Sequence, residues 1–252
     1  MALHVTRWSG LNTVLAMLGH FLEYAINVGD VGTALQFYRS VGFQDVPTAD
    51  FITTPYAAVW DGAAVIGLNE GDHDVRMRFV RPSLQAYLPA LRRHHLEIVD
   101  TELGDDVFNR LVFCDNAGHQ IELLEARTCS LAERESGRIA ACGQFQELSL
   151  PTHSVDDSAN FWSALGFAVE AHESEGLPPR IRVTGSGLSL GYHQMSFNPG
   201  ISFVAPDLAA RAAYLRARGL RLTPVFAPVL SGSTLQLQTP ESNVPLYLGE
   251  DR

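Results

Sequence analysis

Two features that would point to a membrane or to nucleic acid are missing from this sequence: a long apolar run and an excess of positive charge. No stretch of the 252 residues is long and apolar enough to cross a bilayer. The chain has 18 Lys and Arg against 28 Asp and Glu, a net charge of -10, which repels phosphate backbones and anionic lipid. We therefore predict no nucleic-acid partner and no membrane partner.

The start of the chain is moderately apolar, but it lacks the marks of a secretion signal. Asn12, Gly19 and His20 interrupt the apolar run over residues 11–22, and no small-residue cleavage site follows. The run also continues directly into the first predicted strand. We interpret residues 1–20 as an N-terminal arm.

Cysteine is scarce, and the common catalytic motifs are missing. The odd number and the spacing of Cys114, Cys129 and Cys142 argue against both a disulfide framework and a zinc module, so we predict free thiols in a reducing cytoplasm. The sequence has no GxGxxG, P-loop, HExxH or GxSxG motif. Its nine histidines do not cluster at metal-ligand spacings, and we expect His119 and His193, near predicted turns, at the surface.

What the sequence does contain is an internal repeat with a constant offset of 124 residues, the separation of Phe21 from Phe145. Glu23 matches Glu147 at the same offset, and further matches extend over most of the chain without a net gap. Such a repeat indicates a duplication. We predict a first domain over residues 21–126, a polar linker over 127–143 and a second domain over 144–252.

Each repeat alternates strands with helices of matching periodicity. In the first repeat we predict strands at 21–28, 57–60, 64–68, 75–80, 96–100, 110–113 and 120–125. A helix follows Asp30, its expected N-cap, and ends at Gly42; a second helix covers residues 84–93. The pattern predicts an α+β fold with helices packed on one face of curved mixed sheets.

Two motifs then carry a family resemblance. The first is a strand beginning near Glu23, followed by Asp30 and a helix that ends in Phe-Tyr-x-x-x-Gly-Phe at residues 37–43; the second is Asp-x-x-Gly-x-x-x-Glu-Leu at residues 115–123. Together they resemble the vicinal-oxygen-chelate superfamily of glyoxalases, bleomycin-resistance proteins and extradiol dioxygenases, over residues 21–126 and 145–250. The resemblance implies four βαβββ modules that form two tandem cupped mixed-sheet domains.

The resemblance also implies where metal ligands would lie, on the first and last strands of each module. In the first domain these positions fall on Glu23, on Ile66 or Gly67, on Arg76 and on Glu122. In the second domain they fall on Glu147, Leu190 or Gly191, Gly200 and Leu246. Because most of these side chains cannot coordinate a cation, we predict no cofactor; if a divalent metal does bind, Glu23 and Glu122 would hold it.

The carboxylates leave alternatives open. Glu23 and Glu122 form either an ion-pair cluster with Arg76 and Arg78 or a metal or general-base site. Glu147 should have mostly small and apolar neighbours, which would raise its pKa and make it a catalytic base, or else it is simply hydrogen-bonded to backbone or water. We expect those neighbours to line a small-molecule pocket: Ser149, Gly200, Ser202, Leu246 and Leu248.

The leading hypothesis is a cytoplasmic, metal-free protein, monomer or homodimer, that binds an aromatic or oxygen-rich small molecule in one of the cups. The ligand-binding candidates are Glu23, Arg76, Arg78, Glu122, Glu147, Ser149 and Ser202. One alternative is a metal-dependent dioxygenase or glyoxalase-like lyase that uses Glu23 and Glu122. Another is a metal-free isomerase or cyclase with Glu147 or Glu23 as base.

Overall fold

A computed structural model describes residues 17–47, 55–71, 75–94, 96–126, 140–172, 177–225 and 233–250. The first βαβββ module consists of β1 (His20–Asn27), α1 (Val31–Ser40), β2 (Gln44–Val46), β3 (Tyr56–Trp60) and β4 (Val65–Asn69). The second consists of β5 (Val75–Arg81), α2 (Leu84–Arg93), β6 (Glu97–Glu102), β7 (Arg110–Cys114) and β8 (Gln120–Glu125).

The second half of the chain repeats this order. Its first module consists of β9 (Gln144–Pro151), α3 (Val155–Ala164), β10 (Ala168–His172), β11 (Arg180–Gly185) and β12 (Leu188–His193). Its second module consists of β13 (Gly200–Ala205), α4 (Leu208–Ala217), β14 (Leu222–Val225), β15 (Thr234–Leu237) and β16 (Leu246–Glu250).

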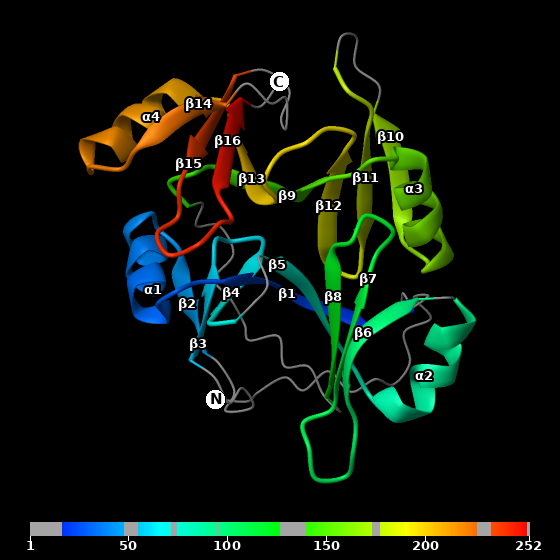
Figure 1. The fold of residues 1–252 in the computed structure, drawn as a ribbon. Helices are drawn as coiled ribbons and strands as arrows, with labels where there is room; N and C mark the ends of the chain where they lie inside the picture. Colours follow the sequence, from blue (N-terminus) through cyan, green and yellow to red (C-terminus); the bar gives the residue numbers. More distant parts are fainter. Residues whose placement is uncertain are drawn as a thin grey trace.

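Each half forms one mixed sheet of eight strands. The strand orders are β2-β3-β4-β1-β5-β8-β7-β6 and β10-β11-β12-β9-β13-β16-β15-β14, so the two sheets have identical topology. The central pair of each sheet, β1 with β5 and β9 with β13, is antiparallel. The predicted α+β class and the four-module organisation are confirmed (Figure 1).

Local sequence explains why the first helix of each half forms where it does. Asp30 caps α1 by accepting a hydrogen bond from Thr33 N, and Ser154 caps α3 in the same way through Asp157 N. Gly42 follows α1 with φ of 95°, a backbone conformation that favours glycine, and Gly166 does so after α3. The repeat therefore extends to the helix boundaries.

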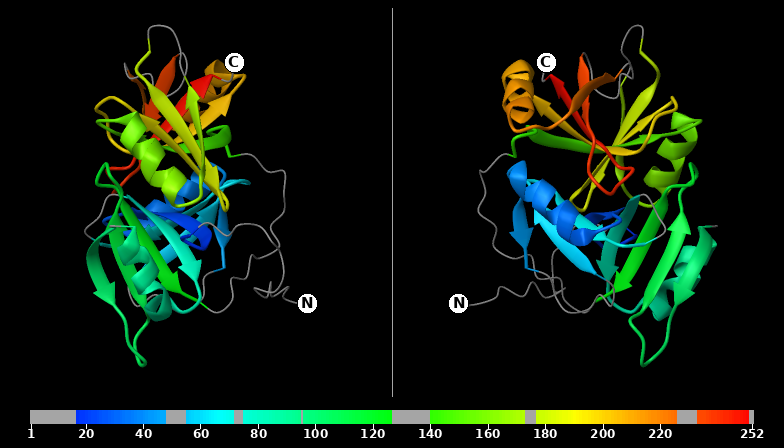
Figure 2. Two further views of the ribbon diagram at one scale, coloured as in Figure 1. Left: turned by 90° about the vertical axis from the view of Figure 1, so that its right-hand side faces the viewer. Right: turned by 60° about the vertical axis from the view of Figure 1, so that its left-hand side comes forward.

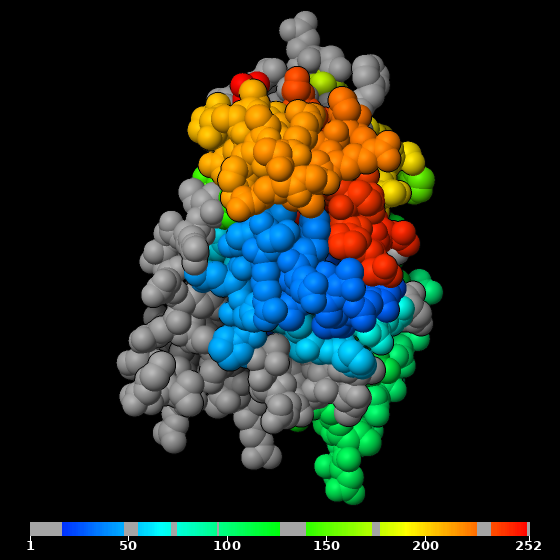
Figure 3. Space-filling view, turned by 90° about the vertical axis from the view of Figure 1, so that its left-hand side faces the viewer, coloured from blue at the N-terminus to red at the C-terminus, as the bar shows by residue number. Residues whose placement is uncertain are grey.

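The two sheets share one hydrophobic core. Tyr24 and Leu148, on the central strands, point into it together with Trp162 of α3, and residues of both halves belong to a single buried cluster. The Tyr24 hydroxyl donates to Ser189 O at 2.9 Å, and the Tyr192 hydroxyl donates to Asp115. Figure 2 shows the first domain directly against the second, and α1 (blue) lies beside α4 (orange) on one side in Figure 3.

The end of the predicted linker is part of this packed structure. Ala140 and Cys142 are fully buried, and Ala141 N donates to Val41 O at 2.8 Å. Residues 1–16 of the predicted arm, residues 127–139 of the linker and Cys129 lie outside the described residues. Among the helices of the described residues, none has the length and apolarity that a membrane crossing requires.

Strand alternation gives each sheet a second face, opposite the one that packs into the shared core. Because successive residues of a strand point to opposite faces, Tyr24 and Leu148 enter the core while Glu23 and Glu147 lie on the other face. We call the face around Glu23 the first cup and the face around Glu147 the second cup. Both glutamates are buried.

Candidate functional sites in the two cups

The first cup is centred on a buried guanidinium held between two carboxylates. Arg78 of β5 donates from Nη1 to Glu23 Oε1 at 2.5 Å and from Nε to Glu122 Oε2 at 2.6 Å. The other oxygen of Glu23 accepts a hydrogen bond from the Tyr56 hydroxyl of β3. Side chains from the neighbouring strands β1, β5 and β8, together with one from β3, therefore form a single cluster in which the charges largely balance.

The partner of the two carboxylates is Arg78, whereas the sequence pointed first to Arg76. Arg76 Nη1 lies 3.7 Å from Glu122 Oε1, and its Nε donates to Gln120 at 2.5 Å. Glu23 pairs in register with Arg78. The register of β1 with β5 shifts by one residue between Phe21 and Glu23, and without this bulge Glu23 would lie opposite Met77.

Burial and charge oppose each other in this cluster. Burial raises the pKa of Glu23, and the Arg78 charge and the Tyr56 hydrogen bond only partly offset it. For Arg78, burial disfavours the charged form, but Glu23 and Glu122 together outweigh burial and raise its pKa. Burial and the nearby Glu23 also raise the pKa of Tyr56, so its hydroxyl stays protonated and donates.

The second cup is built around Glu147, which is fully buried on β9. Its Oε1 accepts hydrogen bonds from His193 Nε2 at 2.9 Å and from the Ser149 hydroxyl at 3.1 Å. The Ser149 hydroxyl also lies 2.6 Å from that of Ser202 on β13. The second oxygen, Oε2, has no hydrogen-bond donor among the described residues.

His193 was predicted at the surface near a turn, and the structure corrects that prediction. The residue ends β12 with 2% of its surface exposed, and its ring faces Glu147. The predicted rise in the pKa of Glu147 is also wrong. Burial does raise it, but the hydrogen bond and charge of His193, with Arg180 and Ser149, together lower the pKa of Glu147 below its ordinary value.

The last strand of the second cup also differs from the prediction. At the constant offset, Leu246 corresponds to Glu122, but the register pairs Ser202 with Tyr247 where Arg78 pairs with Glu122. The second repeat thus carries one additional residue before β16, and Leu246 turns into the core together with Leu248. Tyr247 faces the cup, and burial raises its pKa to about 12.

Glycine leaves room for the glutamate in each cup. A Cβ added at Gly67 of β4 would overlap the carboxylate of Glu23, and one at Gly191 of β12 would overlap that of Glu147. The sequence placed these glycines at ligand positions that lack a ligand. The structure shows that the missing side chains of these glycines leave the space that the carboxylates occupy. Gly200 serves the ring of Tyr247 in the same way.

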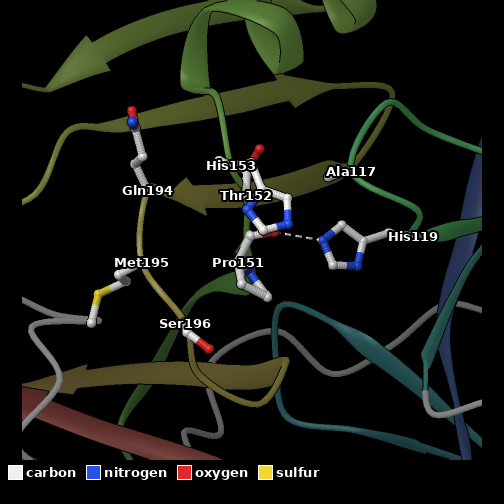
Figure 4. Close-up of a pocket in the computed structure, with 8 residues that line it drawn as sticks. All are labelled: Ala117, His119, Pro151, Thr152, His153, Gln194, Met195 and Ser196. Atoms are coloured by element: carbon white, nitrogen blue, oxygen red, sulfur yellow. Dashed lines mark hydrogen bonds between the residues drawn. The ribbon is translucent and has the colours of Figure 1, made fainter.

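A cavity of about 360 Å³ lies at the domain boundary, where β9 and β12 end (Figure 4). His193 pairs in register with Pro151, and the next residues along both strands line the cavity. From the first domain, His119 reaches across and its Nε2 lies 2.8 Å from Pro151 O. The lining residues are Ala117, His119, Pro151, Thr152, His153, Gln194, Met195 and Ser196.

Neither cup fits a divalent metal ion. In the first, the Arg78 guanidinium occupies the space between the two carboxylates, and cation repulsion opposes a metal there. In the second, one carboxylate and one imidazole are hydrogen-bonded to each other, the Ser149 hydroxyl hydrogen-bonds with that carboxylate, and the Ser202 hydroxyl hydrogen-bonds with Ser149. Within the described ranges, no three His, Cys, Asp or Glu side chains gather as a metal-binding group.

Tyr56, His193 and Tyr247, which contact or face the glutamates of the cups, were not among the sequence candidates. A signal existed for His193, because it stands two residues after Gly191 and therefore on the same face of β12 as a predicted ligand position. No comparable signal existed for Tyr247, because the additional residue before β16 is invisible without the strand pairing.

No protein-family model matches this sequence, and the search of curated proteins found no match. Solved structures do match the fold. The 2,3-dioxygenase LapB from Pseudomonas sp. KL28 has a TM-score of 0.60 at 13% identity, over 94% of this chain and 93% of its own. A catechol 2,3-dioxygenase has a TM-score of 0.59 at 13% identity, over 92% and 87%.

The Mn(II)-bound glyoxalase from Novosphingobium aromaticivorans has a TM-score of 0.56 at 15% identity, over 91% of this chain and 80% of its own. These extradiol dioxygenases and this glyoxalase have the vicinal-oxygen-chelate fold, and the expectation from the sequence motifs is confirmed at that level. Identities this low show a shared fold and leave the chemistry to the residues of each chain.

Proposed function

We propose that this protein binds a small aromatic or oxygen-bearing molecule in its second domain, without a catalytic metal ion. The observation that carries the proposal is the buried Glu147–His193 pair, because His193 is followed along the chain by Gln194, which lines the cavity at the domain boundary. A fixed polar pair beside a small, partly apolar cavity is the usual composition of a small-molecule site.

The unpartnered oxygen of Glu147 supports a ligand that donates a hydrogen bond. A buried acceptor without a donor costs about 1–3 kcal/mol, which a ligand hydroxyl or a water molecule would offset. The rings of Phe197 and Tyr247 lie nearby, with Phe197 5.6 Å from His193 and 6.2 Å from Tyr247 between ring centroids. A flat molecule with a hydroxyl group matches both features.

Access to Glu147 requires a local movement. The carboxylate has no exposed surface, and the half-buried Phe197 follows the cavity residues Gln194 to Ser196 along the chain. A ligand that enters the cavity would therefore displace the 194–197 segment before it reaches the carboxylate. The affinity of such a ligand is reduced by the cost of this movement.

A chromophoric catechol tests the proposal directly. 4-Nitrocatechol is titrated into protein dialysed against EDTA, and its absorption spectrum is followed. We expect saturation at one molecule per chain, and the same affinity before and after chelation. Ala117→Phe, which fills the cavity without removing a polar group, should weaken binding at least tenfold. Ala209→Phe on the exposed face of α4 is the matched control.

Two outcomes would contradict metal-free binding at this site. One is binding that appears only after Fe(II) or Mn(II) is added, together with stoichiometric metal in elemental analysis of the purified protein. The other is an Ala117→Phe variant that binds 4-nitrocatechol as tightly as the Ala209→Phe control does.

A second candidate function is proton transfer in a metal-free isomerase or cyclase, and the geometry of the pair favours it. Among the described residues only Nε2 of His193 is engaged, by Glu147 Oε1, so Nδ1 is the ring nitrogen left for a substrate. A carboxylate that accepts from one imidazole nitrogen makes the other a better base. In this proposal His193 would exchange a proton with the substrate, and Glu147 would hold the imidazole of His193 in position.

This candidate makes a kinetic prediction that plain binding does not. Once a substrate is found, Glu147→Gln should lower kcat at least a hundredfold while ligand affinity stays within a few-fold. His193→Gln should lower kcat at least as much. An equal loss of affinity and of turnover in Glu147→Gln would show that the residue only binds.

A further inference from the structure

The first cup contains two buried carboxylates whose charges are balanced by an arginine of the same domain. Glu23 on β1 and Glu122 on β8 are both buried on the two sides of β5, and two buried carboxylates repel each other unless a cation lies between them. Arg78 supplies that cation from the strand that separates them, with one nitrogen on each carboxylate. The side chains of all three residues are at most 8% exposed.

We propose that the Arg78 guanidinium is a built-in counter-ion that occupies a divalent-cation site, and that removal of this one side chain opens the site to a hard divalent ion. This site lies entirely in the first cup, so its properties do not depend on whether the second domain binds a small molecule.

The oxygens that would bind such an ion are already in place. Glu23 Oε1 and Glu122 Oε2 contact two nitrogens of the same guanidinium, so both oxygens face the space that loss of the guanidinium would leave. The Tyr56 hydroxyl, bonded to the other oxygen of Glu23, adds a neutral donor. Carboxylate and hydroxyl oxygens, completed by water, are ligands that Mn²⁺ and Mg²⁺ prefer.

Two further arginines lie near Glu122, and their positive charges would lower the affinity of this site for a divalent ion. Arg76 Nη1 and Arg110 Nη1 lie 3.7 Å and 3.9 Å from Glu122 Oε1. Arg110 is held mainly by Asp100 at 2.6 Å and Glu102 at 3.1 Å, on the outer strand β6. We therefore expect a weak site, filled at micromolar to millimolar ion rather than at trace levels.

The experiment compares Mn²⁺ binding by full-length wild-type protein and by Arg78→Ala. We expect one Mn²⁺ per chain on Arg78→Ala by electron paramagnetic resonance. We also expect a rise of several degrees in melting temperature at saturating Mn²⁺. Wild-type protein should show neither. Arg110→Ala removes a cation from the same cup but leaves Arg78 in place, so it should behave as wild type does.

The remaining variants keep the inference testable if Arg78→Ala folds poorly. Arg78→His replaces the guanidinium with a metal-ligating side chain and should gain the same Mn²⁺-dependent stabilisation. Adding Glu23→Gln to Arg78→Ala should abolish it. If both variants fold only when Mn²⁺ is present, the inference is supported. If neither Arg78→Ala nor Arg78→His binds or is stabilised by Mn²⁺, it is overturned.

Discussion

The two cups have the same backbone and different contents. In the first, Glu23 and Glu122 close on Arg78 in a cluster of full charges. In the second, Glu147 bonds one histidine and one serine, and the position of Arg78 is taken by Ser202. The duplicated fold determines which strand positions face each cup, but the residues at these positions differ between the two halves.

The two cups differ in whether every buried carboxylate oxygen has a partner. In the first cup each oxygen of the two glutamates lies within 4 Å of a positive or hydroxyl group. In the second cup one oxygen of Glu147 lacks a donor among the described residues, and Gln194, the residue after His193, lines a cavity. We infer that the first cup chiefly stabilises the fold and that the second is the better candidate for ligand binding.

The largest effect that would test this contrast is the loss of Arg78. Arg78→Met leaves two buried carboxylates without their counter-ion and should lower the free energy of unfolding by about 3–5 kcal/mol. Ser202→Ala, the matching change in the second cup, removes one hydrogen bond and should cost about 1 kcal/mol. Urea unfolding at neutral pH measures both.

A triple variant separates charge from packing in that result. Combining Arg78→Met with Glu23→Gln and Glu122→Gln removes all three charges, so most of the lost stability should return. The contrast between the cups fails if Arg78→Met costs no more than Ser202→Ala.

A smaller effect should appear at the glycines that the two cups have in common. Gly67→Ala and Gly191→Ala each place a Cβ where a carboxylate lies, which should cost about 1–3 kcal/mol. Gly191→Ala should also weaken ligand binding in the second domain, because Glu147 must move. The readouts are the urea midpoint and the 4-nitrocatechol titration.

The exposed Gly32 in α1 provides the control for these substitutions. Its Cβ would meet only the Asp30 side chain at 3.5 Å, so Gly32→Ala should leave binding unchanged and stabilise the helix by about 0.5 kcal/mol. Equal tolerance of alanine at positions 32, 67 and 191 would mean that the carboxylates do not need these glycines.

Much of this architecture could be predicted from the sequence because the repeat and the strand and helix patterns are local. Helix α2 and strand β8 begin and end where the residues predict, and the capping role of Asp30 is confirmed. The short strand β2 was not predicted, because three partly exposed residues carry no distinctive alternation.

The side-chain partners were harder to predict because they depend on pairing between distant strands. A one-residue bulge in β1 sets Glu23 opposite Arg78 instead of Met77, and one additional residue before β16 places Tyr247 rather than Leu246 in the second cup. The pKa of Glu147 was misjudged for the same reason, since its neighbour His193 comes from a strand 46 positions later. Pattern alone gives the face of a strand but not the register between strands.

The smallest expected effect is an opposite response of the two cups to acid. The pKa of Glu147 is lowered from its ordinary value of 4.5, so its contribution to stability is present above that pH and is lost as pH falls through the lower folded value. The pKa of Glu23 is raised, so the folded state takes up a proton first, and acidification relieves the cost of its burial.

Glu147→Gln should therefore flatten the loss of unfolding free energy on acidification, by at most about 1.4 kcal/mol per pH unit, the value for one proton. Glu23→Gln should steepen that loss, because it removes the group that gains from acid. The slope is compared below pH 4.5 for Glu147→Gln and above pH 4.5 for Glu23→Gln, because the folded and unfolded states differ in protonation of each glutamate only in that range. If both variants change the slope in the same direction, then the two buried glutamates share one electrostatic environment and the contrast drawn between the cups does not hold.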